Sequence, residues 1–424
     1  MMPPTDAPRS PPVAPPPRNL STGMVKRLRL IGTVDPRSGG PIEGILQQAP
    51  HNLAAGIIEH VVTLDAPDAP WVREFPLHVI ACGAPLSAHT GGWRQRLPWR
   101  RYGYQPDLVP WLKAHVRDYD EIVVHGLWNY STMAARRVLV GAGRPYVVFS
   151  HGMLDPWFQR EQPLKGLMKQ IFWWFNEGPL LNSARYVLFT SEEERLQARQ
   201  VFCPYRVRER VVKYGTSDPQ GDPATQLAAF QARVPALHKP YLLFLSRIHP
   251  KKGCDLLIDA FAEIHGAQEG VDLVLAGPVS EEMRTRLQAQ AQARGIAGRI
   301  HWLGMLSGDA KWGAFRGAQA FVLPSHQENF GIAVAEALAC GCPVLISDKV
   351  NIWREVVEDG GGMVAGDDSD GTSELLARFD ALSPAERTHM GERARICFLQ
   401  RFEVSLAAAS INAALIDASR NQNG

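Results

Sequence analysis

Short apolar runs alternate with amphipathic stretches along most of the chain. Runs of four to seven residues have the length of strands that are buried on both faces, and the stretches between them repeat with the spacing of helices. Strands that alternate with helices are typical of parallel sheets covered by helices on both faces. The runs predict strands at residues 28–34, 59–64, 77–81, 121–125, 146–149, 186–190 and 210–213, and then at 241–246, 272–276, 300–303, 320–323, 343–346 and 362–365.

A polar stretch at residues 216–240, which contains Pro and Gly, separates the two sets of predicted strands. Because 424 residues exceed what one ordinary core holds, the pattern predicts an α/β protein with two doubly wound, Rossmann-like domains that face a central cleft. We expect these domains at residues 25–215 and 241–404, joined by an interdomain linker at 216–240. In such sheets, ligands bind at the carboxyl ends of the strands.

Residues 1–24 are rich in Pro and lack the apolar core of a signal peptide, which predicts a disordered tail. No other run is long and apolar enough to span a bilayer. The six cysteines form no C-x-x-C pair, a pattern that favours reduced thiols. These features predict a cytoplasmic protein.

The net charge of +2 is unevenly distributed. Residues 1–215 contain 26 Lys and Arg against 18 Asp and Glu, whereas the remainder contains 19 against 25. A basic first half favours contact with an anionic surface. We expect the inner face of the cell membrane rather than nucleic acid, since no nucleic-acid module is recognisable; scattered surface Arg is the alternative.

The stretch from Pro324 to Glu336 carries the strongest chemical signal. It follows the apolar run 320–323 and continues into good helix formers, so it predicts a strand, a polar loop with Glu328, and a helix that begins near Gly331. The unpaired N–H groups of a helix start bind phosphate well. Glu328 and Glu336 flank that start, where carboxylates suit sugar hydroxyls. An ordinary strand–helix turn is the alternative.

Four further loops are predicted to face the cleft from strand ends. Arg247 and Lys252 follow the strand at 241–246, where two cations can hold a diphosphate; a solvated basic loop is the alternative. His151 follows the strand at 146–149, and a structural histidine is equally compatible with its position. The remaining candidates are His125 and Trp128 on the acceptor side, where Trp128 either stacks on a sugar or packs, and the pair Gly39-Gly40, which is not a G-x-G-x-x-G fingerprint.

Together, Glu328-x7-Glu336 with Phe330-Gly331 between them, Arg247-x4-Lys252 and His151 resemble the retaining nucleotide-sugar glycosyltransferases of family 4, over roughly residues 27–420. The chain departs from the family pattern at Ser246, where the family usually has Gly. The resemblance implies the GT-B fold and a last helix, within 405–424, that crosses back to the first domain.

The resemblance also implies the roles of the candidate residues. The N–H groups around Asn329, Phe330 and Gly331, with Arg247 and Lys252, would hold the diphosphate. Glu328 would hold sugar hydroxyls, Glu336 the ribose, and His151 would orient the sugar. The loop of Gly39 and Gly40 would lie close to the donor phosphate and the acceptor, with Gly40 on the donor side.

The function expected from this resemblance is transfer of a hexose from a UDP- or GDP-sugar to an acceptor hydroxyl, with retention at the anomeric carbon. A lipid-linked saccharide in bacterial polysaccharide assembly is the expected acceptor, and a small soluble acceptor stays open. No cofactor and no metal are expected, because Asp118 and Asp120 precede a strand, away from the cleft. The alternatives are a sugar-nucleotide epimerase or phosphorylase on the same scaffold, and a non-catalytic sugar-nucleotide-binding assembly subunit.

Two stretches combine aromatic and basic residues in a way that favours membrane contact. The first is the predicted loop at residues 93–102, which contains Arg94, Arg96, Arg100 and Arg101. The second, residues 171–175, follows Lys165 and Lys169, but the family resemblance places this helix in the core. We therefore expect the loop to be the membrane-facing segment.

Overall fold

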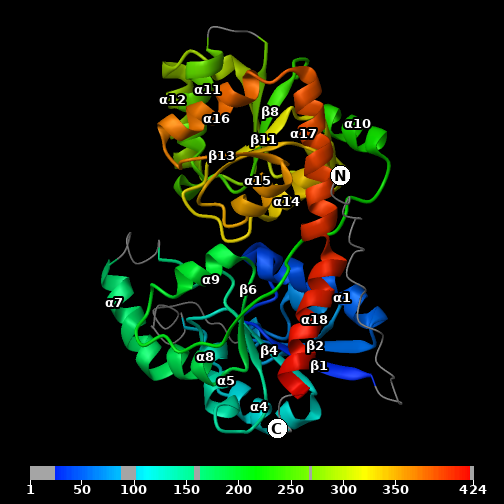
Figure 1. Cartoon of the computed structure of the whole chain (residues 1–424). Helices are drawn as coiled ribbons and strands as arrows, with labels where there is room; N and C mark the ends of the chain where they lie inside the picture. The colour runs from blue at the N-terminus through cyan, green and yellow to red at the C-terminus, as the bar shows by residue number, and fades with distance from the viewer. Residues whose placement is uncertain (1–23, 87–101, 157–162, 267–269, 421–424) are drawn as a thin grey trace, which may run out of the picture.

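The computed structural model describes residues 24–86, 102–156, 163–266 and 270–420, which form two domains, each built around one parallel sheet (Figure 1). The sheet of the N-terminal domain has the order β3-β2-β1-β4-β5-β6-β7, and the sheet of the C-terminal domain has the order β10-β9-β8-β11-β12-β13. Every strand pair is parallel. The strands are β1 (Val25–Leu30), β2 (Ile57–Thr63), β3 (His78–Ala81), β4 (Glu121–His125), β5 (Val147–Phe149), β6 (Tyr186–Phe189), β7 (Glu209–Val211), β8 (Tyr241–Leu245), β9 (Asp272–Ala276), β10 (Ile300–Gly304), β11 (Ala320–Leu323), β12 (Val344–Ser347) and β13 (Gly362–Ala365).

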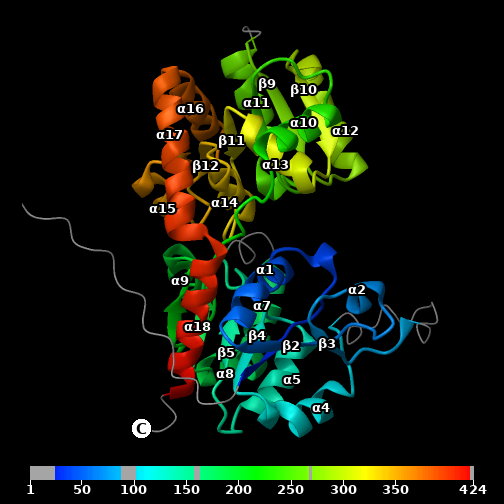
Figure 2. The same cartoon turned by 90° about the vertical axis from the view of Figure 1, so that its right-hand side faces the viewer.

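The predicted α/β class with two doubly wound domains is confirmed, since a strand lies at each apolar run. Helices cover the sheets and join successive strands, as parallel order requires (Figures 1 and 2). None of the helices in the described part of the chain has the length and apolar character needed to cross a bilayer. The helices are α1 (Gly40–Ala54), α2 (Pro70–Arg73), α4 (Leu108–His115), α5 (Tyr130–Leu139), α7 (Pro163–Phe172), α8 (Gly178–Ser183), α9 (Glu192–Ala198), α10 (Pro223–Arg233), α11 (Cys254–His265), α12 (Glu281–Ala293), α13 (Gly308–Gly317), α14 (Ile332–Ala339), α15 (Trp353–Asp359), α16 (Ser369–Asp380), α17 (Pro384–Cys397) and α18 (Val404–Arg420), with π-helical turns η5 (Trp173–Glu177) and η8 (Phe398–Phe402).

The segment predicted as a linker, residues 216–240, contains helix α10, which packs against α13. Phe230 is buried in the core of the C-terminal domain, and Gln226 accepts a hydrogen bond from Arg316 Nε at 2.7 Å. Asp222 caps the helix by accepting a hydrogen bond from Thr225 N. The connection between the domains is therefore shorter than predicted, because a mostly polar helix with few buried side chains does not show a strong apolar period.

Helices α17 and α18, joined by η8, run along both domains (Figures 1 and 2). In the N-terminal domain, α18 packs against α1, and Asn412 accepts a hydrogen bond from Arg27 at 2.7 Å while donating one to Asn52 at 3.0 Å. Tyr186 donates a hydrogen bond to Asp417 Oδ2 at 2.6 Å. The end of the described chain thus completes the domain with which the chain begins.

A buried charge network lies in the middle of the N-terminal sheet. Arg27 and Arg29 of β1 are 0% and 1% exposed, although strand residues with charged side chains rarely lie inside a sheet. Arg27 donates to Glu121 of β4 through Nε and a terminal nitrogen, at 2.9 and 2.8 Å, and also contacts Glu59 of β2. Arg29 donates to the same Glu59 oxygen at 2.7 Å. Each buried guanidinium therefore has a carboxylate partner on a neighbouring strand.

Candidate active site

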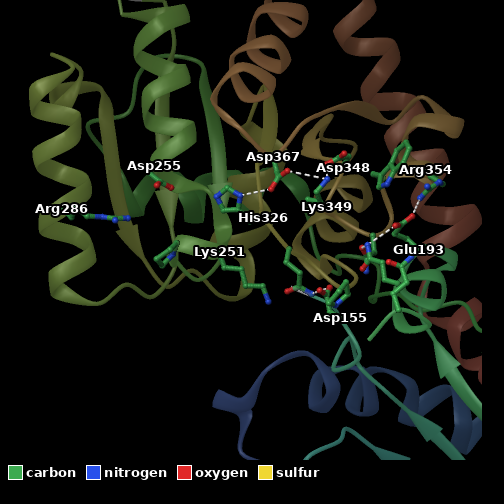
Figure 3. Close-up of a pocket in the computed structure, with 17 residues that line it drawn as sticks. Asp155, Glu193, Lys251, Asp255, Arg286, His326, Asp348, Lys349, Arg354 and Asp367 are labelled. Atoms are coloured by element: carbon green, nitrogen blue, oxygen red, sulfur yellow. Dashed lines mark hydrogen bonds and ion pairs between the residues drawn. The ribbon is translucent and has the colours of Figure 1, made fainter. Parts of the chain in front are cut away.

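A cavity of about 760 Å³ lies between the domains (Figure 3). Asp155 and Glu193 line it from the N-terminal domain, and Lys251 and His326 line it from the C-terminal domain. His326 is hydrogen-bonded to Asp367 at 3.0 Å, as the dashed line in Figure 3 shows. None of the predicted donor residues in the described chain lines this cavity, but their chain neighbours do, so the cavity lies beside the predicted site.

Helix α14 begins at the position expected of a phosphate site. Gly331 is its N-cap, with a φ of 80° that favours glycine. The N–H groups of Gly331, Ile332 and Ala333 donate to no described residue. The side chain of Phe330, in contrast, is buried and packs edge-on against Tyr214 and Phe402. Phe330 therefore anchors the loop, while the backbone that follows it offers free donors.

The predicted cation Lys252 and the predicted carboxylate Glu328 form an ion pair with each other. Their side chains are only 11% and 22% exposed. The backbone of Glu328 is fixed by bridges to the segment before α15, where its N–H donates to Lys349 O at 3.0 Å and its carbonyl accepts from Asn351 N at 3.0 Å. Arg247 lies at the end of β8 and is exposed. One strand end therefore presents a paired lysine and an exposed arginine.

Glu336 lies within α14 and is buried, with 7% of its surface exposed. Burial raises the pKa of its carboxyl above the usual value, while Lys311 of α13 opposes that shift by an ion pair at 2.7 Å. Sequence reasoning missed Lys311, because a single lysine on a helix normally faces solvent. The pair places one fixed carboxylate one helical turn beyond the start of α14.

His151 is held in an unusual backbone conformation, with a φ of 50°. Glu194 of α9 fixes the residues on either side of it, because its carboxylate accepts hydrogen bonds from Ser150 Oγ and Gly152 N, both at 2.8 Å. The same carboxylate also accepts from the N–H and hydroxyl of Thr190. Glu194 is buried, with 4% of its surface exposed, and burial raises the pKa of its carboxyl. Glu194 is thus a supporting residue that sequence reasoning missed.

His125, predicted on the acceptor side, contacts His151 and is 3% exposed. Its Nδ1 is 2.9 Å from His151 Nε2, and its Nε2 is 3.2 Å from an Arg29 nitrogen. Burial, followed by the charge of Arg29, lowers the pKa of both histidines; the pKa of His151 falls to about 3. Both rings are therefore neutral near neutral pH.

The other acceptor-side predictions have mixed surroundings. Trp128 donates through Nε1 to Met153 O at 3.2 Å, its backbone N–H donates to buried Glu177 at 3.0 Å, and its ring packs against Phe202. Trp128 is thus held by packing and hydrogen bonds, and its acceptor-side role stays a prediction. Gly39 has a φ of 88° and caps α1, and a Cβ added at Gly39 or Gly40 would meet no atom within 4 Å. The Gly39-Gly40 loop is therefore open.

The loop of His151 touches the loop of Glu328 across the domain boundary. A Cβ on Gly152 would lie 2.5 Å from the Asn329 side chain, so only glycine permits this approach. Asn329 also lies 3.5 Å from Thr190 Oγ1, and Gln327 donates to Asp155 at 2.7 Å. The two predicted halves of the site, His151 after β5 and Glu328 after β11, therefore meet at one place.

The described residues contain no group of three or more His, Cys, Asp or Glu side chains arranged to hold a metal ion. Asp118 ends a 3-10 turn before β4, and Asp120 accepts a hydrogen bond from Lys26 N at 2.8 Å. The carboxylate of Asp120 therefore joins the start of β4 to β1.

Helix α7 and η5 present an exposed apolar surface, although residues 171–175 were predicted to be core. Trp173 alone of these five has its ring inside, stacked against Phe202 and 1% exposed. The segment packs against the domain through one side only, so its other side chains face outward. We call this surface the α7 face; it consists of Leu164, Leu167, Met168, Ile171, Phe172, Trp174 and Phe175. Of the predicted loop at 93–102, all but Tyr102 lies outside the described residues.

Two family models match most of the chain. Residues 39–215 match the model described as a glycosyl transferase 4-like domain, and residues 227–396 match that of glycosyl transferases group 1. A D-inositol 3-phosphate glycosyltransferase of Actinosynnema mirum is 36% identical over 34% of this chain and 37% of its own length. The match thus spans little more than a third of that relative.

Longer similarities extend over both domains. A GDP-mannose:cellobiosyl-diphosphopolyprenol alpha-mannosyltransferase of Xanthomonas oryzae pv. oryzae is 27% identical over 81% of this chain and 84% of its own length. The structure of Anabaena Alr3699/HepE in complex with UDP and glucose superposes with a TM-score of 0.71 at 18% identity, covering 93% of this chain and all of that chain. With both family models and this shared architecture, the protein belongs to the family 4-like, group 1 glycosyltransferases of the GT-B fold.

Proposed function

We propose that this protein transfers a hexose from a UDP- or GDP-sugar to an acceptor hydroxyl with retention at the anomeric carbon. The observation that carries the proposal is the meeting of three features in one place. These are the N–H groups at the start of α14 that donate to no described residue, the Lys252–Glu328 pair, and the His151 loop of the other domain. Such a site suits a ligand made of a diphosphate and a sugar, and the second domain covers both parts of that ligand.

In this proposal the start of α14 binds the diphosphate together with Arg247 and Lys252. Two cations and a helix N-terminus stabilise the charge that develops as the diphosphate departs. Lys252 then exchanges part of its contact with Glu328 for a phosphate oxygen. Glu328 is thereby available to accept hydrogen bonds from the sugar hydroxyls, and Glu336, held by Lys311, accepts them from the ribose.

Retention is proposed to follow a front-face path. The bond between the anomeric carbon and the phosphate oxygen breaks first, leaving an oxocarbenium-like sugar and a diphosphate. The acceptor oxygen bonds to the same face of that carbon, and its proton passes to the departing phosphate oxygen. This path needs no carboxylate as a covalent nucleophile, and Glu328 is proposed to hold the sugar rather than attack it.

The acceptor is proposed to be a lipid-linked saccharide at the inner face of the cell membrane. The α7 face supports this proposal, because seven apolar side chains are exposed together. Lys165 and Lys169 lie on the same helix, and Arg136 and Arg137 of α5 line a hollow with Phe172 and Phe175. Apolar residues bordered by cations fit the surface of an anionic bilayer.

A turnover assay tests the proposed activity. The protein is incubated with radiolabelled UDP- and GDP-sugars and a membrane extract, and label is followed into the lipid fraction and into soluble products. Transfer to lipid supports the full proposal, and transfer to a soluble sugar removes the lipid acceptor. Conversion of the donor alone would identify an epimerase. Labelled sugar phosphate formed when inorganic phosphate is added would identify a phosphorylase, and binding without turnover would identify an assembly subunit.

Activity is expected to survive EDTA. Arg247, Lys252 and the start of α14 already neutralise the diphosphate, so a divalent cation has little charge left to balance. The same assay with and without EDTA measures this. A complete loss that manganese restores would contradict the expectation and direct attention to carboxylates such as Asp118.

Binding to anionic liposomes is expected to depend on the α7 face. Each basic side chain near an anionic leaflet contributes about 1 kcal/mol, and salt screens that attraction beyond roughly 8 Å. The apolar side chains of the α7 face would contact the bilayer interface between these cations. The variant Leu164→Ser/Leu167→Ser/Phe175→Ser removes three of them and should lose flotation with anionic liposomes at low salt. The variant Val357→Ser/Ile396→Ser/Leu399→Ser removes exposed apolar residues of the C-terminal domain and should float like the wild type.

Two outcomes would count against membrane attachment through the α7 face. The first is flotation that is equal on neutral and anionic liposomes or insensitive to salt, and the second is equal loss in both triple variants. Absence of wild-type flotation at low salt would remove the membrane surface as a partner and favour a soluble acceptor.

A further inference from the structure

A chain of hydrogen-bonding groups leads from the buried charge network to the active site. Glu59 binds Arg29 at 2.7 Å, Arg29 lies 3.2 Å from Nε2 of His125, and Nδ1 of His125 lies 2.9 Å from Nε2 of His151. Glu59, Arg29 and His125 are each at most 5% exposed. The proposed roles of the site residues use His151 but leave the other three without a purpose.

The direction of each hydrogen bond in this chain follows from Arg29. A guanidinium only donates, so Nε2 of His125 must accept and carries no proton. A neutral imidazole has its single proton on the other nitrogen, which places the proton of His125 on Nδ1. That proton is donated to Nε2 of His151, so the proton of His151 is also on Nδ1. No described residue is hydrogen-bonded to this last Nδ1.

The surroundings hold both rings in the orientation that this chain requires. The two imidazole planes are within 16° of parallel, and the ring of Phe149 stacks on His151 at 4.5 Å with an angle of 7°. Glu194 fixes the backbone on both sides of His151. After burial, the charges of Arg29 and Arg27 disfavour a second proton on His125. Rotation of either ring would break the hydrogen bond between the two histidines or the one from Arg29. With the rings held in place, the alternative tautomer would put a proton on Nε2 of His125, where it would face the Arg29 donor.

We propose that Arg29 and His125 are positioning residues that fix the tautomer of His151, so that its Nδ1–H is a hydrogen-bond donor to an oxygen of the bound sugar nucleotide. His151 itself is the residue that touches the donor. The proposal gives the buried arginine a role in specificity: a neutral donor of fixed direction recognises an acceptor oxygen and does not compete with the cations for the phosphates. Its consequence for turnover rests on the proposed function, whereas the tautomer does not.

The tautomers of the wild-type protein test the proposal directly. Protein labelled with ¹⁵N-histidine is studied by two-bond ¹H–¹⁵N correlation, and the signals of His125 and His151 are assigned from their loss in His125→Gln and His151→Gln. Both rings are expected to carry the proton on Nδ1 at neutral pH, the form that histidine disfavours in water. A proton on Nε2 of either neutral ring would overturn the proposal.

A matched pair of variants separates the hydrogen bond from the stability of the charge network. Glu59→Gln and Arg29→Met/Glu59→Gln both lose the buried ion pair, but only the second loses the donor to His125. Glu59→Gln should keep the wild-type tautomers, and the double variant should move the protons to Nε2. Arg29→Lys retains a donor and should keep the wild-type pattern, which provides a third comparison if the double variant does not fold.

The turnover rate then tests the positioning role. With the sugar nucleotide that the wild type uses, kcat of the double variant is expected to fall roughly 10²-fold below that of Glu59→Gln, as when one preorganised donor is lost. Shifted tautomers with unchanged kcat would refute the positioning role. An inactive wild type with the expected tautomers would instead refute the proposed function and leave the assignment of the protons intact.

Discussion

Replacement of Lys252 or Arg247 by alanine is expected to lower kcat/KM roughly 30- to 1000-fold. Each cation is proposed to bind the departing diphosphate in a partly enclosed site, where one charge-assisted contact contributes roughly 2–4 kcal/mol to the transition state. Steady-state kinetics with the sugar nucleotide identified by the turnover assay measures the effect. Glu328→Gln should be similarly severe, because an amide is a weaker acceptor than the carboxylate that is proposed to hold the sugar hydroxyls.

Arg294→Ala is the matched control for these substitutions. Arg294 is also a cation of the C-terminal domain, but it pairs with Asp259 on the outer helices and is 54% exposed. Its loss should leave kcat/KM within about twofold of the wild type, since exposed pairs contribute little. Wild-type kinetics for both Lys252→Ala and Arg247→Ala would exclude them from the diphosphate site.

Arg27→Met is expected to lower the free energy of unfolding by about 3–5 kcal/mol. The substitution leaves Glu121 buried without its cation, and removal of one member of a buried pair exposes the full cost of burying the other. It also removes the donor to Asn412 of α18. Urea denaturation followed by circular dichroism measures the change.

Arg210→Met provides the comparison. Arg210 pairs with Asp417 of the same helix α18, but at 3.4 Å and with both side chains well exposed, so a loss of less than about 1 kcal/mol is expected. The double variant Arg27→Met/Glu121→Gln should recover part of the stability lost in Arg27→Met. Equal effects of Arg27→Met and Arg210→Met would mean that the buried network does not hold the sheet together.

The strands were predictable from sequence because parallel strands buried on both faces are continuous apolar runs. The exception is the start of β1, which lies at Val25 rather than at residue 28. Lys26, Arg27 and Arg29 interrupt the apolar pattern there, and nothing in the local sequence shows that carboxylates on two other strands neutralise the arginines. Burial of a charge depends on partners that are distant in sequence, and the sequence of one segment does not show which partners these are.

The candidate site was predictable to the extent that its residues follow strand ends. Lys252, Glu328 and His151 do so, and the structure brings their loops together. The supporting residues were not predictable. Ser191-x-x-Glu194 has the spacing of a capping box, and Ser191 Oγ accepts a hydrogen bond from Glu194 N. The Glu194 carboxylate, however, holds the loop of His151. Its role depends on the placement of α9 beside the loop that follows β5, which no local pattern encodes.

The path of α18 has a consequence for how the protein is made. This helix leaves the ribosome only after the whole second domain has been synthesised, yet it supplies Asn412 to Arg27 and packs against α1. The first domain is therefore synthesised before the segment that covers part of its surface. A fragment containing residues 25–215 alone corresponds to the first domain without α18. Adding the α18 sequence as a separate peptide supplies the helix that the fragment lacks.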